Sequence, residues 1–159
     1  MRKSWMTFVF IAGLFSCDEN RVYDTNQDLE GRQWLVTDKP VFEFSISDPT
    51  VNYSIYCNIR NAVSYPYSRL FVNYELMDSA GNGLQKSLVS AFLFDQKTGK
   101  PFGESGLGDL YDQRIPLIEN YTFKNPGKYK VRLEQYMRTD TLQGIVAIGV
   151  RVEKTRLSK

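Results

Sequence analysis

Histidine is missing from this chain of 159 residues, and cysteine is scarce. Without histidine, the Ser-His-Asp and Cys-His arrangements of nucleophilic catalysis are excluded. The commonest protein ligand of zinc and copper is missing as well. Only two cysteines are present, Cys17 and Cys57, so no disulfide framework is expected. We therefore predict no catalytic residues, no metal site and no cofactor.

Neither sign of charge is in clear excess. The chain has 20 basic and 18 acidic residues, and two of the basic ones, Arg2 and Lys3, lie in a segment that we expect to be removed. The rest of the chain is then neutral and lacks the positive surface that binds phosphates. We predict no nucleic-acid partner.

The apolar run at the N-terminus is short. Residues 4–16 carry no charge, follow Arg2 and Lys3, and give way to polar sequence from Asp18 onwards. A basic start, an apolar run of about 7–15 residues and a small residue before the cut describe a secretory signal peptide. A transmembrane helix needs about 20 apolar residues. We predict a signal peptide over residues 1–16.

The residues Leu14-Phe15-Ser16-Cys17 resemble the lipobox of bacterial lipoproteins. This resemblance implies lipidation of Cys17 and attachment to a membrane through the acyl chains. An ordinary cleaved secretion signal is the alternative. Once Cys17 is lipidated, Cys57 has no intrachain partner, and its apolar surroundings predict a small buried residue.

The rest of the chain divides into three parts. Residues 17–33 are polar and are interpreted as a tether, which could span at most about 55–60 Å. A single folded domain is expected over residues 34–154, and residues 155–159 form a basic tail that we expect to be frayed.

Alternating apolar and polar residues dominate the expected domain. Such a pattern is typical of half-buried β-strands, and Gly, Asn, Asp and Pro clusters separate the strands. In the last strand, Val146, Ile148, Val150 and Val152 are expected on one side. No amphipathic helix of ten or more residues is recognisable after Cys17. The expected strands are 42–46, 51–61, 70–77, 84–94, 115–123, 128–137 and 145–152. The pattern predicts an all-β fold, a single antiparallel β-sandwich that is jelly-roll-like.

The segment 103–112 combines three glycines with Glu104, Asp109, Tyr111 and Asp112. Its simplest interpretation is a glycine-shaped crossover loop, within a long loop that we expect to extend through Asp112. Contact with a partner or ligand is a second interpretation. Calcium binding is a third, because carboxylates are hard oxygen ligands, although the spacing is not that of an EF-hand. A pair of carboxylates for glycoside hydrolysis is the most remote option.

A second candidate site consists of aromatic residues in expected loops. Tyr65 and Tyr67 flank Pro66, and Phe102 lies in the long loop. These rings either pack the ends of the sandwich or form an exposed platform for a sugar or a peptide.

Several separated blocks resemble the gliding-motility lipoprotein family GldH of the Bacteroidetes. They cover most of the chain in the same order, together with the lipobox and the Cys17-Asp18 start. The blocks are Arg60-Asn61 with 65–70, Gly106-Leu107-Gly108-Asp109-Leu110, 134–138, 142–145 and 149–154. The resemblance implies a cell-envelope lipoprotein that is associated with surface gliding, in organisms whose adhesin export uses the type IX secretion pathway. It implies no enzymatic activity and no cofactor.

These observations predict a non-enzymatic lipoprotein that acts as an accessory or docking component of the gliding or type IX secretion machinery. Its expected partners are the membrane, through Cys17, and other envelope proteins. The outer membrane is favoured, with the domain facing the periplasm or the cell surface. The alternative is a carbohydrate-binding β-sandwich module on the cell surface.

Overall fold

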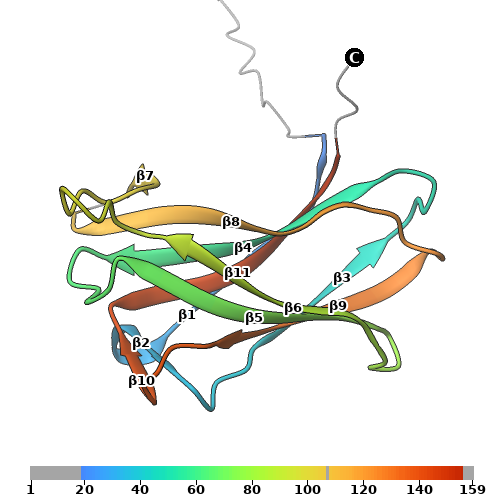
Figure 1. Cartoon of the computed structure of the whole chain (residues 1–159). Helices are drawn as coiled ribbons and strands as arrows, with labels where there is room; N and C mark the ends of the chain where they lie inside the picture. The colour runs from blue at the N-terminus through green and yellow to red at the C-terminus, as the bar shows by residue number, and fades with distance from the viewer. Residues whose placement is uncertain (1–18, 107, 156–159) are drawn as a thin grey trace, which may run out of the picture.

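The computed structural model describes residues 19–106 and 108–155, which form an all-β fold (Figure 1). The expected signal peptide, the lipidation site Cys17 and residues 156–159 of the expected tail lie outside these residues. In chain order the elements are β1 (Arg21–Asp28), the 3-10 helix η1 (Glu30–Arg32), β2 (Gln33–Leu35), β3 (Val41–Ile46), β4 (Tyr53–Ala62), β5 (Arg69–Asp78), β6 (Gly83–Phe92), β7 (Glu104–Ser105), β8 (Leu110–Tyr121), β9 (Gly127–Gln135), β10 (Thr141–Gln143) and β11 (Ile145–Lys154).

The long strands form two sheets that pack face to face. One sheet has the order β1-β11-β4-β8-β7 and the other has the order β3-β9-β5-β6, with a short β10-β2 ladder beside them. All strand pairs are antiparallel. When the short β7 is left aside, each of the two sheets has four strands. The order in which the chain passes through these eight strands is that of a jelly roll. The predicted antiparallel, jelly-roll-like sandwich is confirmed.

The two ends of the sandwich carry different segments. At the end that we name proximal, the described chain starts and finishes, and the Lys154 amide donates a 2.8 Å hydrogen bond to the Asn20 carbonyl. Figure 1 shows β2, β10 and β7 at the opposite, distal end, away from both termini. The distal segments are 29–40, 63–68, 93–106 and 136–144.

The core lies between the sheets and follows the predicted alternation. In β3, Phe42, Phe44 and Ile46 are buried while the residues between them are exposed. Toward the proximal end, the Phe123 ring lies 4.4 Å from the ring of Tyr129, measured between centroids. At the distal end, Trp34 is fully buried, and its indole nitrogen donates a 2.9 Å hydrogen bond to the Asp38 carbonyl.

The interpretation of residues 17–33 as a tether is wrong for residues 21–28, which form β1. This strand pairs with β11 from Arg21 opposite Glu153 to Asp28 opposite Ala147. An edge strand has one neighbour and needs only part of one face buried, so a largely polar sequence can form it. Val22 and Tyr23 are the residues of β1 that pack against the core.

The expected loop through Asp112 is also too long. Strand β8 begins at Leu110, which pairs with Ala62 of β4, and β7 pairs with the next two residues of β8. Asp112 lies opposite Arg60 of β4 and opposite Glu104 of β7. The carboxylate-rich segment therefore enters a sheet instead of staying in a loop.

A β-bulge changes the expected alternation in β11. The register with β4 shifts between Ile145 and Ala147. A bulge adds one unpaired residue and so exchanges the two faces of the strand. Ile145 consequently lies in the core in place of Val146, whereas Ile148, Val150 and Val152 lie there as predicted.

Cys57 is fully buried in β4, as predicted. Burial raises the pKa of its thiol to about 12, so almost none is present as the reactive thiolate at neutral pH. We expect iodoacetamide to leave Cys57 unmodified in the folded protein and to modify it fully after unfolding, as mapped by mass spectrometry. Modification of the folded protein at the rate of a free cysteine would contradict this burial.

Candidate functional site

A groove lies on the outer face of the larger sheet. Its volume is about 510 Å³, within the range of about 300–1,000 Å³ that is typical of small-ligand sites. Strands β1, β4, β8 and β11 and the segment of β7 supply its walls. The lining residues are Asp24, Asn26, Asn58, Ile59, Arg60, Gly103, Glu104, Asp112, Gln113, Arg114 and Ala147.

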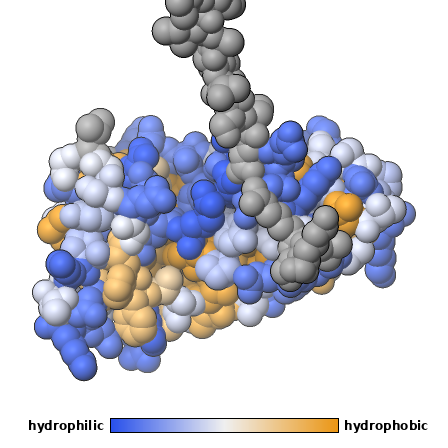
Figure 2. Space-filling model, turned by 90° about the horizontal axis from the view of Figure 1, so that it is seen from above, coloured by the Kyte–Doolittle hydropathy of each residue, from blue (hydrophilic) through white to orange (hydrophobic). Residues whose placement is uncertain are grey.

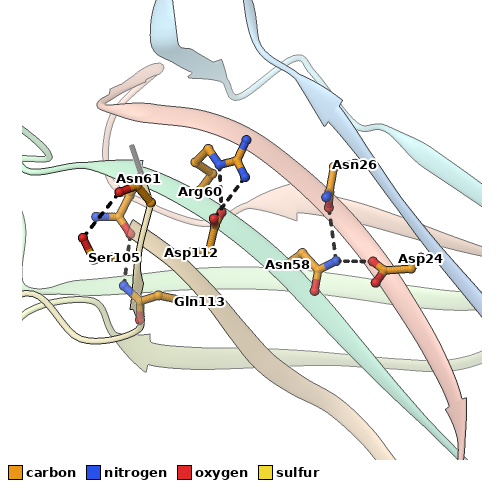
Figure 3. A network of polar contacts seen from close by, with 9 residues as sticks. Asp24, Asn26, Asn58, Arg60, Asn61, Ser105, Asp112 and Gln113 are labelled. Atoms are coloured by element: carbon orange, nitrogen blue, oxygen red, sulfur yellow. Dashed lines mark hydrogen bonds and ion pairs between the residues drawn. The ribbon is translucent and has the colours of Figure 1, made fainter. Parts of the chain in front are cut away.

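Gly149 of β11 lets the groove extend from β4 to β1. In the register of the sheet, Gly149 lies between Asn26 of β1 and Asn58 of β4. Because Gly149 has no side chain, the Asn58 amide reaches across β11 and donates hydrogen bonds to Asp24 (2.8 Å) and Asn26 (3.1 Å), as Figure 3 shows. A Cβ atom on Gly149 would overlap the Asn26 side-chain oxygen and the Thr25 carbonyl oxygen.

An ion pair occupies the middle of the groove (Figure 3). Arg60 Nε and Nη2 donate to the two carboxylate oxygens of Asp112 at 2.8 and 3.0 Å. These hydrogen bonds raise the pKa of Arg60 above its ordinary value. The two side chains are 42% and 45% exposed, so the pair contributes at most about 1 kcal/mol to stability. Its main effect is to fix the two charged groups in position.

Arg151 holds the β1 side of the groove. Its side chain is only 8% exposed and donates 2.8 Å hydrogen bonds to Asp24 and Glu153. Asp24 therefore accepts one bond from Arg151 and another from Asn58, through different oxygens. This carboxylate is occupied by the protein's own donors.

The segment that contains β7 forms the opposite wall. Gly103 has a φ of +86°, and a Cβ atom there would overlap the Asp112 carbonyl oxygen, so glycine permits this close approach to β8. Gln113 also fixes this wall, because its amide donates a 3.0 Å hydrogen bond to the Asn61 side chain. The backbone thereby places Glu104 beside Asp112.

Two charged side chains of the groove remain available to a ligand. In the described ranges, neither Glu104 nor Arg114 forms an ion pair. Both residues are exposed, and the Arg114 guanidinium lies 5.9 Å from the centre of the Tyr56 ring. The groove can therefore bind a polar surface through one carboxylate and one guanidinium.

Residues of the kinds that carry out hydrolysis do not converge in the groove. Its lining includes no serine, cysteine or lysine. Asp112 is paired with Arg60 and Asp24 with Arg151, which leaves Glu104 without a second free carboxylate for a glycosidase pair. Across residues 19–106 and 108–155, no group of three or more acidic or cysteine side chains is arranged to hold a metal ion. The same residues contain no helix long and apolar enough to cross a membrane.

The model of the GldH lipoprotein family matches residues 21–152, from the start of β1 to near the end of β11. The chain belongs to the GldH lipoprotein family. This confirms the resemblance that the sequence blocks indicated. The match includes all the residues that line the groove.

Curated relatives cover almost the whole chain. The gliding motility lipoprotein GldH homolog of Christiangramia forsetii is 33% identical, over 98% of this chain and 99% of the relative. The gliding motility lipoprotein GldH of Flavobacterium johnsoniae is 28% identical, over 89% of each chain.

Solved structures are more distant from this GldH-family chain. A structure of the infectious bursal disease virus Gx strain has a TM-score of 0.44 and 13% identity, over 97% of this chain and 36% of that chain. Dimeric latent PorU from Porphyromonas gingivalis has a TM-score of 0.33 and 12% identity, over 85% of this chain and 13% of that chain. Neither likeness is close enough to support a statement about function.

The fold of this GldH-family chain brings together part of the predicted site. Glu104 and Asp112 line the groove. Tyr111 is the neighbour of Asp112 in β8 and is half-buried. Asp109 lies at the same distal end, in an exposed ion pair of 3.5 Å with Arg32.

The predicted aromatic residues lie outside the groove. Tyr65 is 5% exposed, and its hydroxyl donates a 3.0 Å hydrogen bond to the Arg69 carbonyl, so its ring packs in the core. Tyr67 and Phe102 are each 44% exposed. Of the expected platform, therefore, only Tyr67 and Phe102 offer an open ring.

Sequence reasoning missed the residues that β1 and β4 contribute to the groove. Asn58 and Arg60 alternate with the buried Cys57 and Ile59. This alternation places Asn58 and Arg60 on the outer face. Nothing in this local pattern indicates that β1 lies two strands away and supplies Asp24 and Asn26. Only the pairing of β1 with β11 shows it.

Proposed function

We propose that this chain is a non-enzymatic, lipid-anchored lipoprotein of the cell envelope that supports gliding motility by docking a protein of the motility or type IX secretion machinery. The family match supports a lipoprotein, and the names of the two relatives support a role in gliding. The groove carries the docking role, because Glu104 and Arg114 line it, are exposed and form no ion pair in the described ranges.

The anchor holds the domain close to the membrane. Asn20 is hydrogen-bonded to the domain through its carbonyl, and only three peptide links separate Asn20 from Cys17. These links span at most about 11 Å. A lipid on Cys17 therefore places the proximal end next to the bilayer, which we propose to be the outer membrane, and the distal end faces away from it.

A protein partner fits the groove better than a carbohydrate does. None of the lining residues is aromatic, whereas sugar-binding sites combine polar groups with a ring that packs against the sugar. The face seen from above in Figure 2, on the side of β7 and β8, is mainly hydrophilic, with hydrophobic residues gathered along one border. A surface of this kind resembles the polar part of a protein interface.

The test of the docking role is a charge reversal at Arg114. We expect Arg114→Glu in a gliding host to reduce gliding or surface-protein export at least tenfold, because a partner carboxylate would then meet a negative charge. The variant should remain folded and membrane-bound, because Arg114 forms no ion pair in the described ranges. Cell spreading, secreted protein and membrane fractionation are the measurements.

Lys128→Glu is the matched control. Lys128 is an exposed basic residue on the outer face of the other sheet, paired with Glu43. Its reversal changes the net charge equally and leaves the groove intact. Normal gliding with Arg114→Glu, or an equal defect with Lys128→Glu, would show that the groove is not the docking surface.

A further inference from the structure

Strand β6 (Gly83–Phe92) carries apolar residues on its outer face. In the register with β5, Ser87 lies opposite Tyr74 and Val89 opposite Val72, and both partners are buried between the sheets. Since residues that lie opposite each other share a face, Ser87 and Val89 point inward. The residues between and beyond them, Lys86, Leu88, Ser90 and Phe92, point outward. This arrangement differs from the polar outer face of an ordinary sandwich.

A hollow of about 470 Å³ opens beside Leu88 on this outer face. Leu88 and Tyr136 are 45% and 59% exposed there. The hollow is lined by Tyr67, Phe71, Leu88, Tyr136, Met137 and Arg138. A contiguous exposed surface of aliphatic and aromatic side chains marks an interaction site in a soluble domain.

Among the strands of residues 19–106 and 108–155, none lies on one side of β6. The strand is ten residues long and pairs with β5 alone at the border of its sheet. It contains no proline, and Lys86 is its only charged residue. Proteins usually protect such an edge with prolines, several charges or a cover, because its free backbone groups pair readily with another strand.

The position of this surface does not fit a membrane as its occupant. Tyr67 and Tyr136 belong to distal segments, and β6 ends at this end of the sandwich. A strand of ten residues is about 33 Å long. Leu88 lies five residues beyond the start of β6, so about 17 Å of strand separates it from the proximal end, where the chain leads to the expected anchor, and the other lining residues at Tyr67 and Tyr136 lie in distal segments.

The border of the hollow is positively charged. Arg138 lines it, and the Arg69 guanidinium lies 4.1 Å from the centre of the Phe92 ring. Within the described part of the chain, Arg69, Lys86 and Arg138 form no ion pair. An occupant with acidic residues would complement these charges.

We propose that β6 and the adjoining hollow bind an extended, acidic segment of a partner protein by strand addition. The segment pairs through its backbone with the free side of β6 and directs apolar side chains, at every second position, onto Leu88, the lining residue of the hollow that lies in this edge strand. Its acidic residues face Arg69, Lys86 and Arg138. The inference deepens the proposed docking role, and it concerns a surface separate from the groove.

The test places a photo-reactive phenylalanine analogue at Leu88 of the full-length chain in a gliding host. The same analogue at Ser45, an exposed residue of the other edge strand β3, is the matched control. We expect at least tenfold more crosslinked protein from position 88 than from position 45. Mass spectrometry should locate the crosslink in a partner segment that combines alternating apolar residues with aspartate or glutamate.

Other outcomes would overturn the proposal. Equal crosslinking at positions 88 and 45 would show that β6 has no preferred occupant. Crosslinks to phospholipid would assign the surface to the membrane, and crosslinks to a second copy of the chain would assign it to self-association.

A second variant separates this surface from the groove. With the analogue at Ser90, Leu88→Arg should lower the crosslinked protein at least tenfold, because it places a charge in the apolar contact. Arg114→Glu should leave the crosslink unchanged. A loss of crosslinking in both variants would show that the two surfaces are not independent and would contradict a separate β6 site.

Discussion

Replacing Gly149 with alanine is expected to destabilise the fold by about 3 kcal/mol, near the upper end of overpacking effects. The new methyl group would overlap the backbone carbonyl of Thr25, which cannot move without separating β1 from β11. Chemical denaturation should show the lower free energy of unfolding. Hydrogen exchange should show faster exchange of the β1 amides, and the Asn58 bonds to Asp24 and Asn26 should be lost.

Gly83→Ala is the matched control for this prediction. Gly83 also lies in a strand, but the nearest atom to an added Cβ is the end of the flexible Glu75 side chain, at 3.0 Å. We expect a loss of less than about 1 kcal/mol there. Equal effects of the two substitutions would refute the special role of Gly149 in joining β1 to the sheet.

Replacing Cys17 with alanine is expected to move nearly all of the protein from the membrane fraction to the soluble fraction. Each methylene group buried in a bilayer contributes about 0.8 kcal/mol, and stable attachment needs more than one acyl chain. A protein without the thiol cannot carry these chains. A gliding host that produces only this variant is therefore expected to stop gliding. Fractionation, immunoblotting and intact-mass measurement provide the readout.

Cys57→Ala is the control for the loss of a cysteine. Cys57 is buried in β4, so this variant is expected to lose some stability and to keep its lipid. Continued membrane attachment of the Cys17→Ala variant, or a wild-type protein whose mass includes no lipid, would disprove the anchor.

Much of the fold was predictable from the period of two in the sequence. Phe42, Phe44 and Ile46 show it clearly, because one face of β3 packs on the core and the other faces water. The absence of helical periodicity then predicted a sandwich of antiparallel strands. The jelly-roll order agrees with the prediction because the rules for connecting strands allow only a few topologies for a two-sheet sandwich of this size.

Strand β1 escaped prediction because its sequence carries little of this pattern. Most of its side chains are exposed, and Val22 and Tyr23 alone pack against the core. What stabilises β1 is its backbone pairing with β11 and the bond from Arg151 to Asp24. Such long-range contacts cannot be deduced from the local sequence.

Only part of the candidate site was predictable, because the groove also depends on long-range contacts between strands. Glu104 and Asp112 are recognisable in one glycine-rich segment, whereas Asn58 and Arg60 become part of the groove only through the register of three strands. For the aromatic residues the sequence left packing and an exposed platform as alternatives, because the loop sequence around Pro66 does not reveal that Tyr65 points into the core.

The pairing of β1 with β11 has a consequence for how the protein matures during export. Residues 21–28 leave the translocation channel before the other described strands, and the strand with which they pair, residues 145–154, leaves after them. The sandwich therefore cannot close strand by strand as the chain emerges. Until translocation is complete, residues 21–28, next to the proposed lipid attachment site, have no strand to pair with, and their polar and charged side chains disfavour aggregation during this time.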